Sequence, residues 1–229
     1  MDTVKGTALG LGVVGLVLGG VIGYAVAESS DDEVTTTTNN NSDNSADGVT
    51  QETSDLRNDL NAEMREHVTL ASSSLTTAFD EGLEADKTAA ALAELDKNSV
   101  AIADLVGSVF PDSRDDFLSL WRNHIGFFAD YTVAAKAGDQ EAMDKAQLDL
   151  AGYGEDASQF FGNNLDDLTP EQVKPLLVEH RDLVIDAVNA YGAGNYDEFY
   201  AAEAAAYNQI GTVADALSGA IGNQFLLTN

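Results

Sequence analysis

Cysteine is absent from the 229 residues, and only three prolines and eleven basic residues are present. Without cysteine the chain has no disulfide, no thiolate metal ligand and no cysteine nucleophile. Eleven Lys and Arg against 39 Asp and Glu give a formal charge of −28, and this charge excludes nucleic-acid binding through a basic surface. Scarce proline together with 44% hydrophobic residues predicts a packed, helix-rich body.

The N-terminal residues 8–27 carry no charge. A helix of that length spans roughly 30 Å, the thickness of a bilayer core. We therefore expect residues 1–27 to form a signal anchor that holds the chain in the cell membrane by a single pass, with its bulk outside the cytoplasm. An A-x-A sequence ending at Ala27 leaves an alternative, a cleaved signal and a secreted protein.

Two overlapping G-x-x-x-G steps lie within this apolar segment. They would allow two such helices to approach closely and form a homo-oligomer. The glycines concerned are Gly15, Gly19 and Gly23.

Residues 28–55 are rich in Ser, Thr, Asn and Asp, which predicts a disordered, solvated linker. The acidity continues after this segment, because residues beyond 50 hold 32 acids against ten bases. A surface this acidic is screened in high salt, so the composition favours a halophilic protein. A calcium-loaded surface is the alternative, although the sequence has no D-x-[DN]-x-[DN]-G loop.

Residues 56–229 contain a repeat of about 56 residues. The only histidines are His67, His124 and His180, and each is followed 14 or 15 residues later by a glycine. These glycines are Gly82, Gly138 and Gly194. We expect an all-α, up-and-down bundle of three antiparallel helical hairpins, six helices in all. The expected repeats cover about residues 56–111, 112–168 and 169–229.

Helix boundaries are visible in the sequence. The segment TPEQ at residues 169–172 supplies an N-cap Thr, a Pro at the first helical position and a capping-box Gln. Gly138 followed by Asp139, and Gly194 followed by Asn195, each offer a helix-ending glycine and an N-cap side chain. Connections this short require neighbouring helices to run antiparallel.

The pattern is carried by the stretches LWRNHIGFFADYTVAAKAGD, LLVEHRDLV and YNQIGTVADALSGAIGNQF. In them the chain resembles an uncharacterised family of secreted, Bacillus-type bacterial proteins made of three His-bearing helical hairpins. The resemblance covers roughly residues 56–225 and implies the six-helix fold and an exported location, but no activity. In that family the second helices carry Asn, Asn and His at one matched place. Here the matching residues are Asn98, Tyr153 and Gln209.

Each histidine belongs to an apolar seam with helical spacing, so we expect all three to face the interior. Counted from the turn of each hairpin, one residue of the second helix lies at the height of each histidine. The expected pairs are His67 with Asn98, His124 with Tyr153, and His180 with Gln209. In one interpretation these are neutral core pairs, hydrogen-bonded across each hairpin. In the other, the three histidines converge to bind Zn²⁺ or Cu²⁺, and their partners contact the ligand.

No catalytic motif accompanies the three histidines and their predicted partners. The sequence has no G-x-S-x-G, P-loop or HExxH, and the one local carboxylate–His step is Glu63 with His67. We therefore expect no enzyme and no obligatory cofactor. The predicted function is a membrane-anchored, non-enzymatic binding or interaction module of the cell envelope; the alternative is a metal- or small-ligand-binding bundle. A hydrolase with a scattered site is a third hypothesis.

Overall fold

A computed structural model describes residues 51–226 of the chain. The expected signal anchor over residues 1–27, and most of the expected linker over 28–55, lie outside the described residues. Within residues 51–226, no helix is long and apolar enough to cross a membrane.

The described part of the chain is helical throughout and contains no strand, as the sequence predicts. Six α-helices follow one another, with a single 3₁₀ turn before the third and a short π-helix after the last. They are α1 (Gln51–Glu81), α2 (Asp86–Val109), η1 (Pro111–Ser113), α3 (Arg114–Ala137), α4 (Gln140–Asn164), α5 (Pro170–Gly192), α6 (Tyr196–Ile221) and η2 (Gly222–Leu226).

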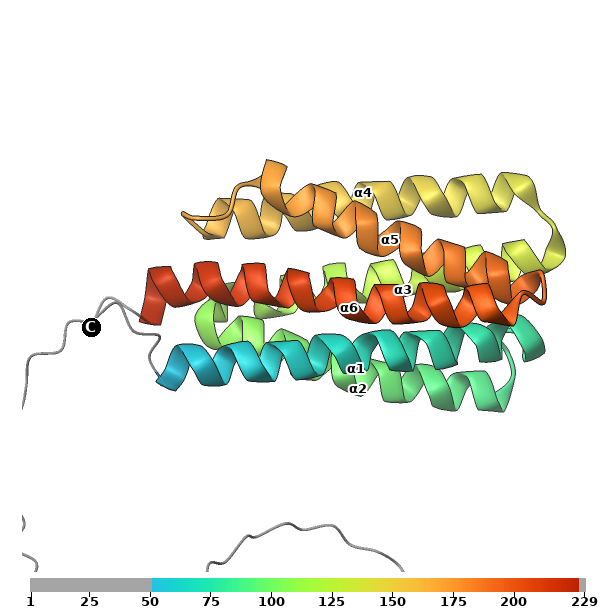
Figure 1. The fold of residues 1–229 in the computed structure, drawn as a ribbon, viewed down its shortest axis with the longest axis horizontal. Coiled ribbons are helices and arrows are strands. Elements are labelled where there is room, and N and C mark those ends of the chain that lie inside the picture. The colour runs from blue at the N-terminus through green and yellow to red at the C-terminus, as the bar shows by residue number, and fades with distance from the viewer. Residues whose placement is uncertain (1–50, 227–229) are drawn as a thin grey trace, which may run out of the picture. The chain divides into compact units, whose positions relative to one another are not determined.

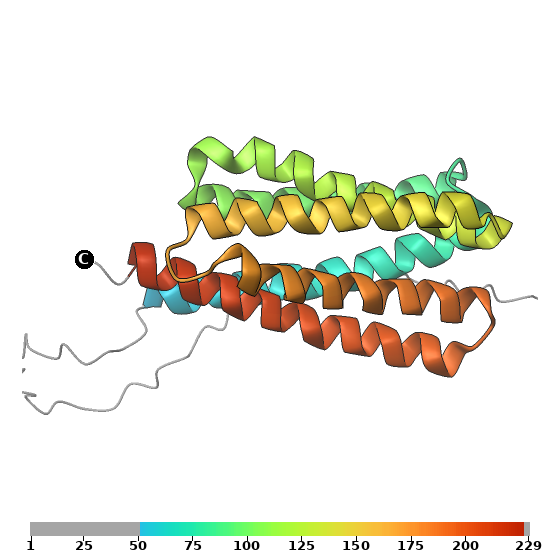
Figure 2. The same ribbon diagram turned by 90° about the horizontal axis from the view of Figure 1, so that it is seen from above.

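The helices form three antiparallel hairpins whose closing turns lie at one end of the bundle (Figure 1). Consecutive helices pack against each other, and α6 returns to pack against α1, so the six helices form a closed ring (Figure 2). The first helices of the hairpins, α1, α3 and α5, run parallel and also contact one another. These are the helices that carry the histidines, so the fold directs all three toward a common interior.

Glycine ends each first helix, as predicted. Gly82, Gly138 and Gly194 have φ values of 88°, 68° and 74°, a left-handed conformation that costs other residues energy. The Asp139 carboxylate then caps α4 by accepting a hydrogen bond from the Ala142 N–H at 3.1 Å. Asn195 differs from the prediction, because its side chain donates to Glu198 instead of capping the backbone of α6.

The start of α5 shows the predicted capping-box contact. The Thr169 N–H donates to Oε1 of Gln172 at 2.8 Å, and Pro170 occupies the first helical position. Proline costs little at this place because its missing N–H would have no partner within the helix.

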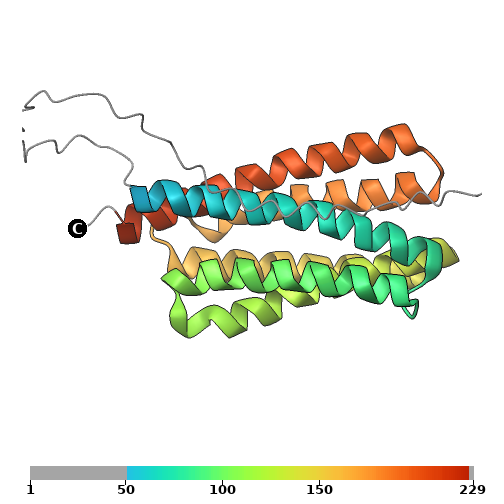
Figure 3. The ribbon, with the colours of Figure 1, turned by 90° about the horizontal axis from the view of Figure 1, so that it is seen from below.

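Helix α1 begins earlier than predicted, because residues 51–55 are helical. Thr53 is buried against Gly222, which follows α6. The two residues are so close that a Cβ at position 222 would collide with the Thr53 side chain. Figure 3 shows the start of α1 lying along the end of α6. This contact joins the start of the first helix to the residues that follow the last α-helix. It also extends α1 into the segment that the sequence assigned to the linker.

The interior follows the predicted seams. In α3 the buried seam residues include Phe117, Trp121, His124, Phe128 and Tyr131. One large apolar cluster contains the seam residues that precede the histidines. They are Leu60 and Met64 of α1, Phe117 and Trp121 of α3, and Val173 of α5. Burial of these rings and aliphatic side chains supplies the main driving force for the fold.

Candidate functional site

The structure brings the three histidines together at one level of the bundle. His67, His124 and His180 are 3%, 3% and 8% exposed and line the same cavity. The rings of His67 and His124 have centroids 5.4 Å apart. Each histidine comes from a different hairpin, and their convergence follows from the parallel arrangement of α1, α3 and α5.

Trp121 lies between two of these histidines. Its ring centroid is 4.9 Å from that of His67 and 4.7 Å from that of His124. The pairs predicted from the sequence do not include Trp121. The available signal was its position on the same seam, one helical turn before His124.

Tyr153 meets His124 as the hairpin geometry predicts, but by stacking. The two rings are 4.6 Å apart between centroids, with planes 21° from parallel. The expected hydrogen bond across this hairpin is therefore replaced by contact between two flat rings, because Tyr153 approaches the face of the imidazole and not its edge.

Asn98 and Gln209 also lie at the predicted height, and they make equivalent contacts. The Asn98 Nδ2 group donates to the backbone oxygen and to Oε2 of Glu63, both at 2.9 Å. The Gln209 Nε2 group donates to the backbone oxygen of Leu176 at 2.8 Å. Glu63 and Leu176 each precede a layer histidine by four residues. The first and third hairpins thus tie the second helix to the backbone of the first, one turn away from the imidazole.

Several buried polar atoms in this layer have no hydrogen-bond partner among the described residues. They are Nδ1 of His67, His124 and His180, Oδ1 of Asn98, Oε1 of Gln209, Nε1 of Trp121 and, further along α1, Oγ of Ser74. The three Nδ1 atoms depart from the expectation of fully hydrogen-bonded core pairs, although hydrogen bonds with Asn98 and Gln209 still act on His67 and His180. Buried polar groups are paired in the large majority of cases. The layer therefore presents hydrogen-bonding capacity that its own side chains do not use.

Burial keeps the three imidazoles neutral. It lowers the pKa of His67 to about 3 and that of His180 to about 4, and it lowers the pKa of His124 well below its usual value. The nearby imidazoles add to this lowering at His67 and His124, while the amides of Asn98 and Gln209 raise the pKa of His67 and His180 in part. Burial also raises the pKa of the Tyr153 hydroxyl.

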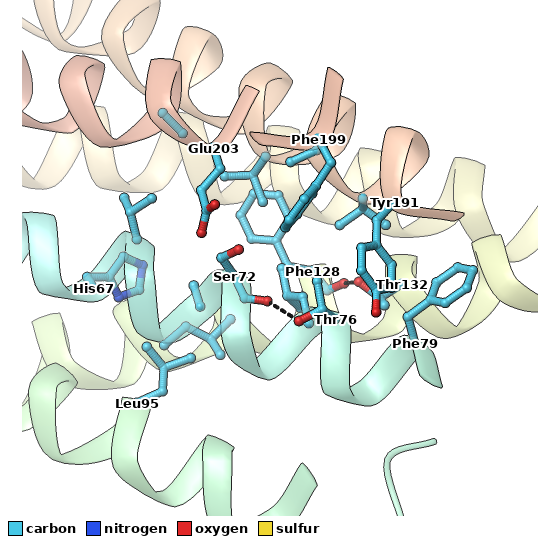
Figure 4. Close-up of a pocket in the computed structure, with 18 of the residues that line it drawn as sticks. His67, Ser72, Thr76, Phe79, Leu95, Phe128, Thr132, Tyr191, Phe199 and Glu203 are labelled. Atoms are coloured by element: carbon cyan, nitrogen blue, oxygen red, sulfur yellow. Dashed lines mark hydrogen bonds between the residues drawn. The ribbon is translucent and has the colours of Figure 1, made fainter. Parts of the chain in front are cut away.

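The histidines line a cavity of about 40 Å³ that extends from their layer toward the turns at the ends of α1 and α5. Figure 4 shows this space between α1, α3, α5 and α6. Its walls are mostly apolar. The aromatic members are Phe79, Phe128, Tyr191 and Phe199, and the polar members besides the histidines are Ser72, Thr76, Thr132 and Glu203.

A second cavity of about 120 Å³ lies on the other side of His124, Phe128 and His180, which line both spaces. Its walls include Trp121 and Tyr153, with two basic residues of α5. Both basic side chains are already paired with carboxylates: Lys174 with Glu155, and Arg181 with Asp182. The central layer is therefore open to a cavity on each side.

The predicted metal site is not formed by the side chains as they lie. In the described part of the chain, no three His, Cys, Asp or Glu side chains are grouped so that they could hold a metal ion. Coordination of Zn²⁺ or Cu²⁺ by His67, His124 and His180 remains a prediction, and it requires the imidazoles to move toward one another.

No protein family model matches this chain, and no curated protein or solved structure matches it. The resemblance to secreted three-hairpin proteins thus stays a prediction from the sequence. The chemistry of the central layer and its cavities is what bears on function.

Proposed function

We propose that this chain is a non-enzymatic binding protein whose helical bundle holds a small ligand at the central histidine layer. One observation carries the proposal: three buried imidazoles from three hairpins line one cavity, and the Nδ1 atom of each lacks a partner among the described residues. Leaving a buried polar group unpaired costs about 1–3 kcal/mol. A ligand with hydrogen-bonding groups would offset that cost at several atoms together.

The protonation state of the layer supports binding over acid–base catalysis. A general acid or base works best when its pKa lies near the working pH. Burial instead lowers the pKa of His67 to about 3 and that of His180 to about 4. Glu203 is the one carboxylate among the described residues that line the cavity, so no pair of carboxylates with separated roles accompanies the histidines.

We place this binding protein at the cell envelope. The support comes from the sequence: an uncharged apolar run over residues 8–27, and an acidic polar segment that follows it. In this proposal residues 1–27 anchor the chain, the bundle stands outside the cytoplasm, and the ligand reaches the cavity from that side. The glycine steps of the anchor would allow two copies to associate.

A metal-binding bundle is the second candidate. It is favoured by the 5.4 Å separation of the His67 and His124 ring centroids, and by the neutral state of both imidazoles, which is the state that coordinates Zn²⁺ or Cu²⁺. Equilibrium dialysis followed by metal analysis decides between the two. One metal per chain, lost on His124→Ala, would favour the metal site over the small ligand.

A cavity-filling variant tests the proposed function. Ala71 lines the cavity on α1, one turn after His67, whereas Ala62 is exposed on the same helix. The full-length protein is exposed to a mixture of cellular small molecules, and native mass spectrometry measures what it retains. We expect wild type and Ala62→Leu to retain the same compound and Ala71→Leu to lose it, because the added side chain occupies the space. Equal retention by Ala71→Leu would place the ligand elsewhere.

A further inference from the structure

We propose that the ligand of the histidine-lined cavity is a small organic cation of the alkylammonium class. This inference rests on the proposed function and names the chemistry of the molecule that the cavity takes. Three features of the cavity point to it: one carboxylate, a group of aromatic rings, and buried imidazoles whose Nδ1 atoms lack partners among the described residues.

The carboxylate is Glu203 of α6. Its side chain is partly buried, and no ion pair or hydrogen bond from another described residue reaches it. Figure 4 shows it extending from α6 toward the space bordered by His67 and Ser72 of α1. Among the described residues that line this cavity, none is Lys or Arg. Glu203 therefore gives the cavity a negative charge that no described basic lining residue offsets, so the cavity is complementary to a cation.

The aromatic rings lie toward the turn end of the same cavity. Phe79 and Tyr191 have ring centroids 5.6 Å apart, and Tyr191 and Phe199 have centroids 5.2 Å apart, both in edge-to-face arrangements. Such faces attract ammonium groups through their quadrupole. Phe79 already receives one, since Nζ of Lys136 lies 5.7 Å from its ring centroid. The Tyr191 hydroxyl donates to Oδ2 of the exposed Asp80 at 2.7 Å, which holds this ring in place.

The imidazoles determine which chemical group the other end of the ligand carries. A neutral imidazole offers one N–H donor and one acceptor nitrogen, so a hydroxyl or N–H group can satisfy it without bringing a charge into the apolar layer. The cavity of about 40 Å³ has room for roughly three water molecules, about 90 Å³ of liquid water, so its ligand is small. A compact ammonium group between Glu203 and Phe199 of α6, with a short polar arm toward the histidines, meets both requirements (Figure 4). The overall charge of −28 attracts such a cation and disfavours an anion.

Isothermal titration calorimetry of the full-length protein tests the charge requirement. The probe is choline, and its control is the uncharged tert-butyl analogue in which carbon replaces nitrogen. We expect choline to bind at least about tenfold more tightly than the analogue, because only choline gains cation–π and carboxylate attraction. Glu203→Gln should weaken choline binding by about tenfold for the same reason. Glu198→Gln, an equal change of charge at an exposed position of the same helix, should leave it unchanged.

Two results would overturn the cation. One is equal binding of choline and its uncharged analogue by wild type, a comparison that does not depend on any variant folding correctly. The other is unchanged choline affinity in Glu203→Gln whose circular dichroism matches wild type. Either result leaves the proposed function standing if wild type still retains a compound that Ala71→Leu loses. Loss of that difference between wild type and Ala71→Leu removes the proposed function itself.

Discussion

Tyr153 stacks on the face of His124, with ring centroids 4.6 Å apart and planes 21° from parallel. The other two hairpins place an amide at this height, and each amide is hydrogen-bonded to backbone of the neighbouring helix. The second hairpin thus holds its histidine by ring contact, with Trp121 on another side at 4.7 Å between centroids. In all three hairpins the Nδ1 atom of the histidine has no partner among the described residues, which is consistent with a role in binding.

Replacing His124 tests how much this ring contributes to packing. His124→Ala removes a fully buried ring and leaves Trp121 and Tyr153 facing a void, so we expect a loss of about 2–4 kcal/mol in the free energy of unfolding. His124→Leu fills the space without a polar atom and should cost less than about 1.5 kcal/mol. Urea unfolding at fixed salt, followed by Trp121 fluorescence, measures both. Equal stability of wild type and His124→Ala would mean that this ring is not packed in the core.

The histidine layer could be predicted from the sequence because it depends on local periodicity. Steps of three and four residues place His67, His124 and His180 on interior seams, and equal distances from the turns place Asn98 and Gln209 beside two of them. The turn glycines follow from equally local chemistry. Each of these features needs only the geometry of one hairpin.

The hydrogen-bond partners could not be predicted, because they depend on side-chain orientation between helices. Asn98 and Tyr153 have the expected heights, yet one donates to the Glu63 backbone and the other stacks. Glu203 and Phe199 enter the cavity because α6 packs against α1, a contact that joins the last α-helix of the bundle to the first. Nothing in the spacing of a single hairpin specifies that closure. The same closure buries Thr53 and moves the start of α1 to Gln51.

Salt should stabilise this protein strongly. Most basic side chains of the bundle are already paired with a carboxylate, for example Arg122 with Asp96 and Arg57 with Asp215, so the excess acids repel one another. We expect the melting temperature to rise steeply between low and molar NaCl as this repulsion is screened. Removing exposed charges with Asp112→Asn and Asp197→Asn should reduce the slope. A melting temperature independent of salt would contradict the halophilic interpretation.

The proposed topology predicts where an external protease cuts. If residues 1–27 anchor the chain and the bundle stands outside, protease added to intact cells should release the bundle. We expect cleavage between about Asp31 and the start of α1 at Gln51, since the linker predicted from the sequence would be cut before folded helices. Mass spectrometry of the released fragment gives the cut site. Full protection in intact cells, with cleavage after lysis, would reverse the orientation.

The last prediction concerns pH. Because burial lowers the pKa of His67 to about 3 and that of His180 to about 4, the folded chain takes up these protons later than the unfolded chain, whose histidines titrate near 6.5. The stabilisation is therefore complete above about pH 6.5 and is lost progressively as the pH falls toward the folded values. Between about pH 6.5 and 5 the carboxylates of the unfolded chain remain mostly ionised, so the loss in that window reports the histidines.

Equilibrium unfolding at constant ionic strength, measured in steps across this window, should show stability falling with decreasing pH. His67→Gln keeps a neutral polar side chain but cannot take up a proton, so its stability should fall less steeply by the contribution of one histidine. Glu198→Gln, exposed and remote from the layer, should keep the wild-type slope. A flat profile in wild type between about pH 6.5 and 5 would mean that the histidines are protonated as easily in the folded chain as in the unfolded one. Their placement in a buried central layer would then be wrong.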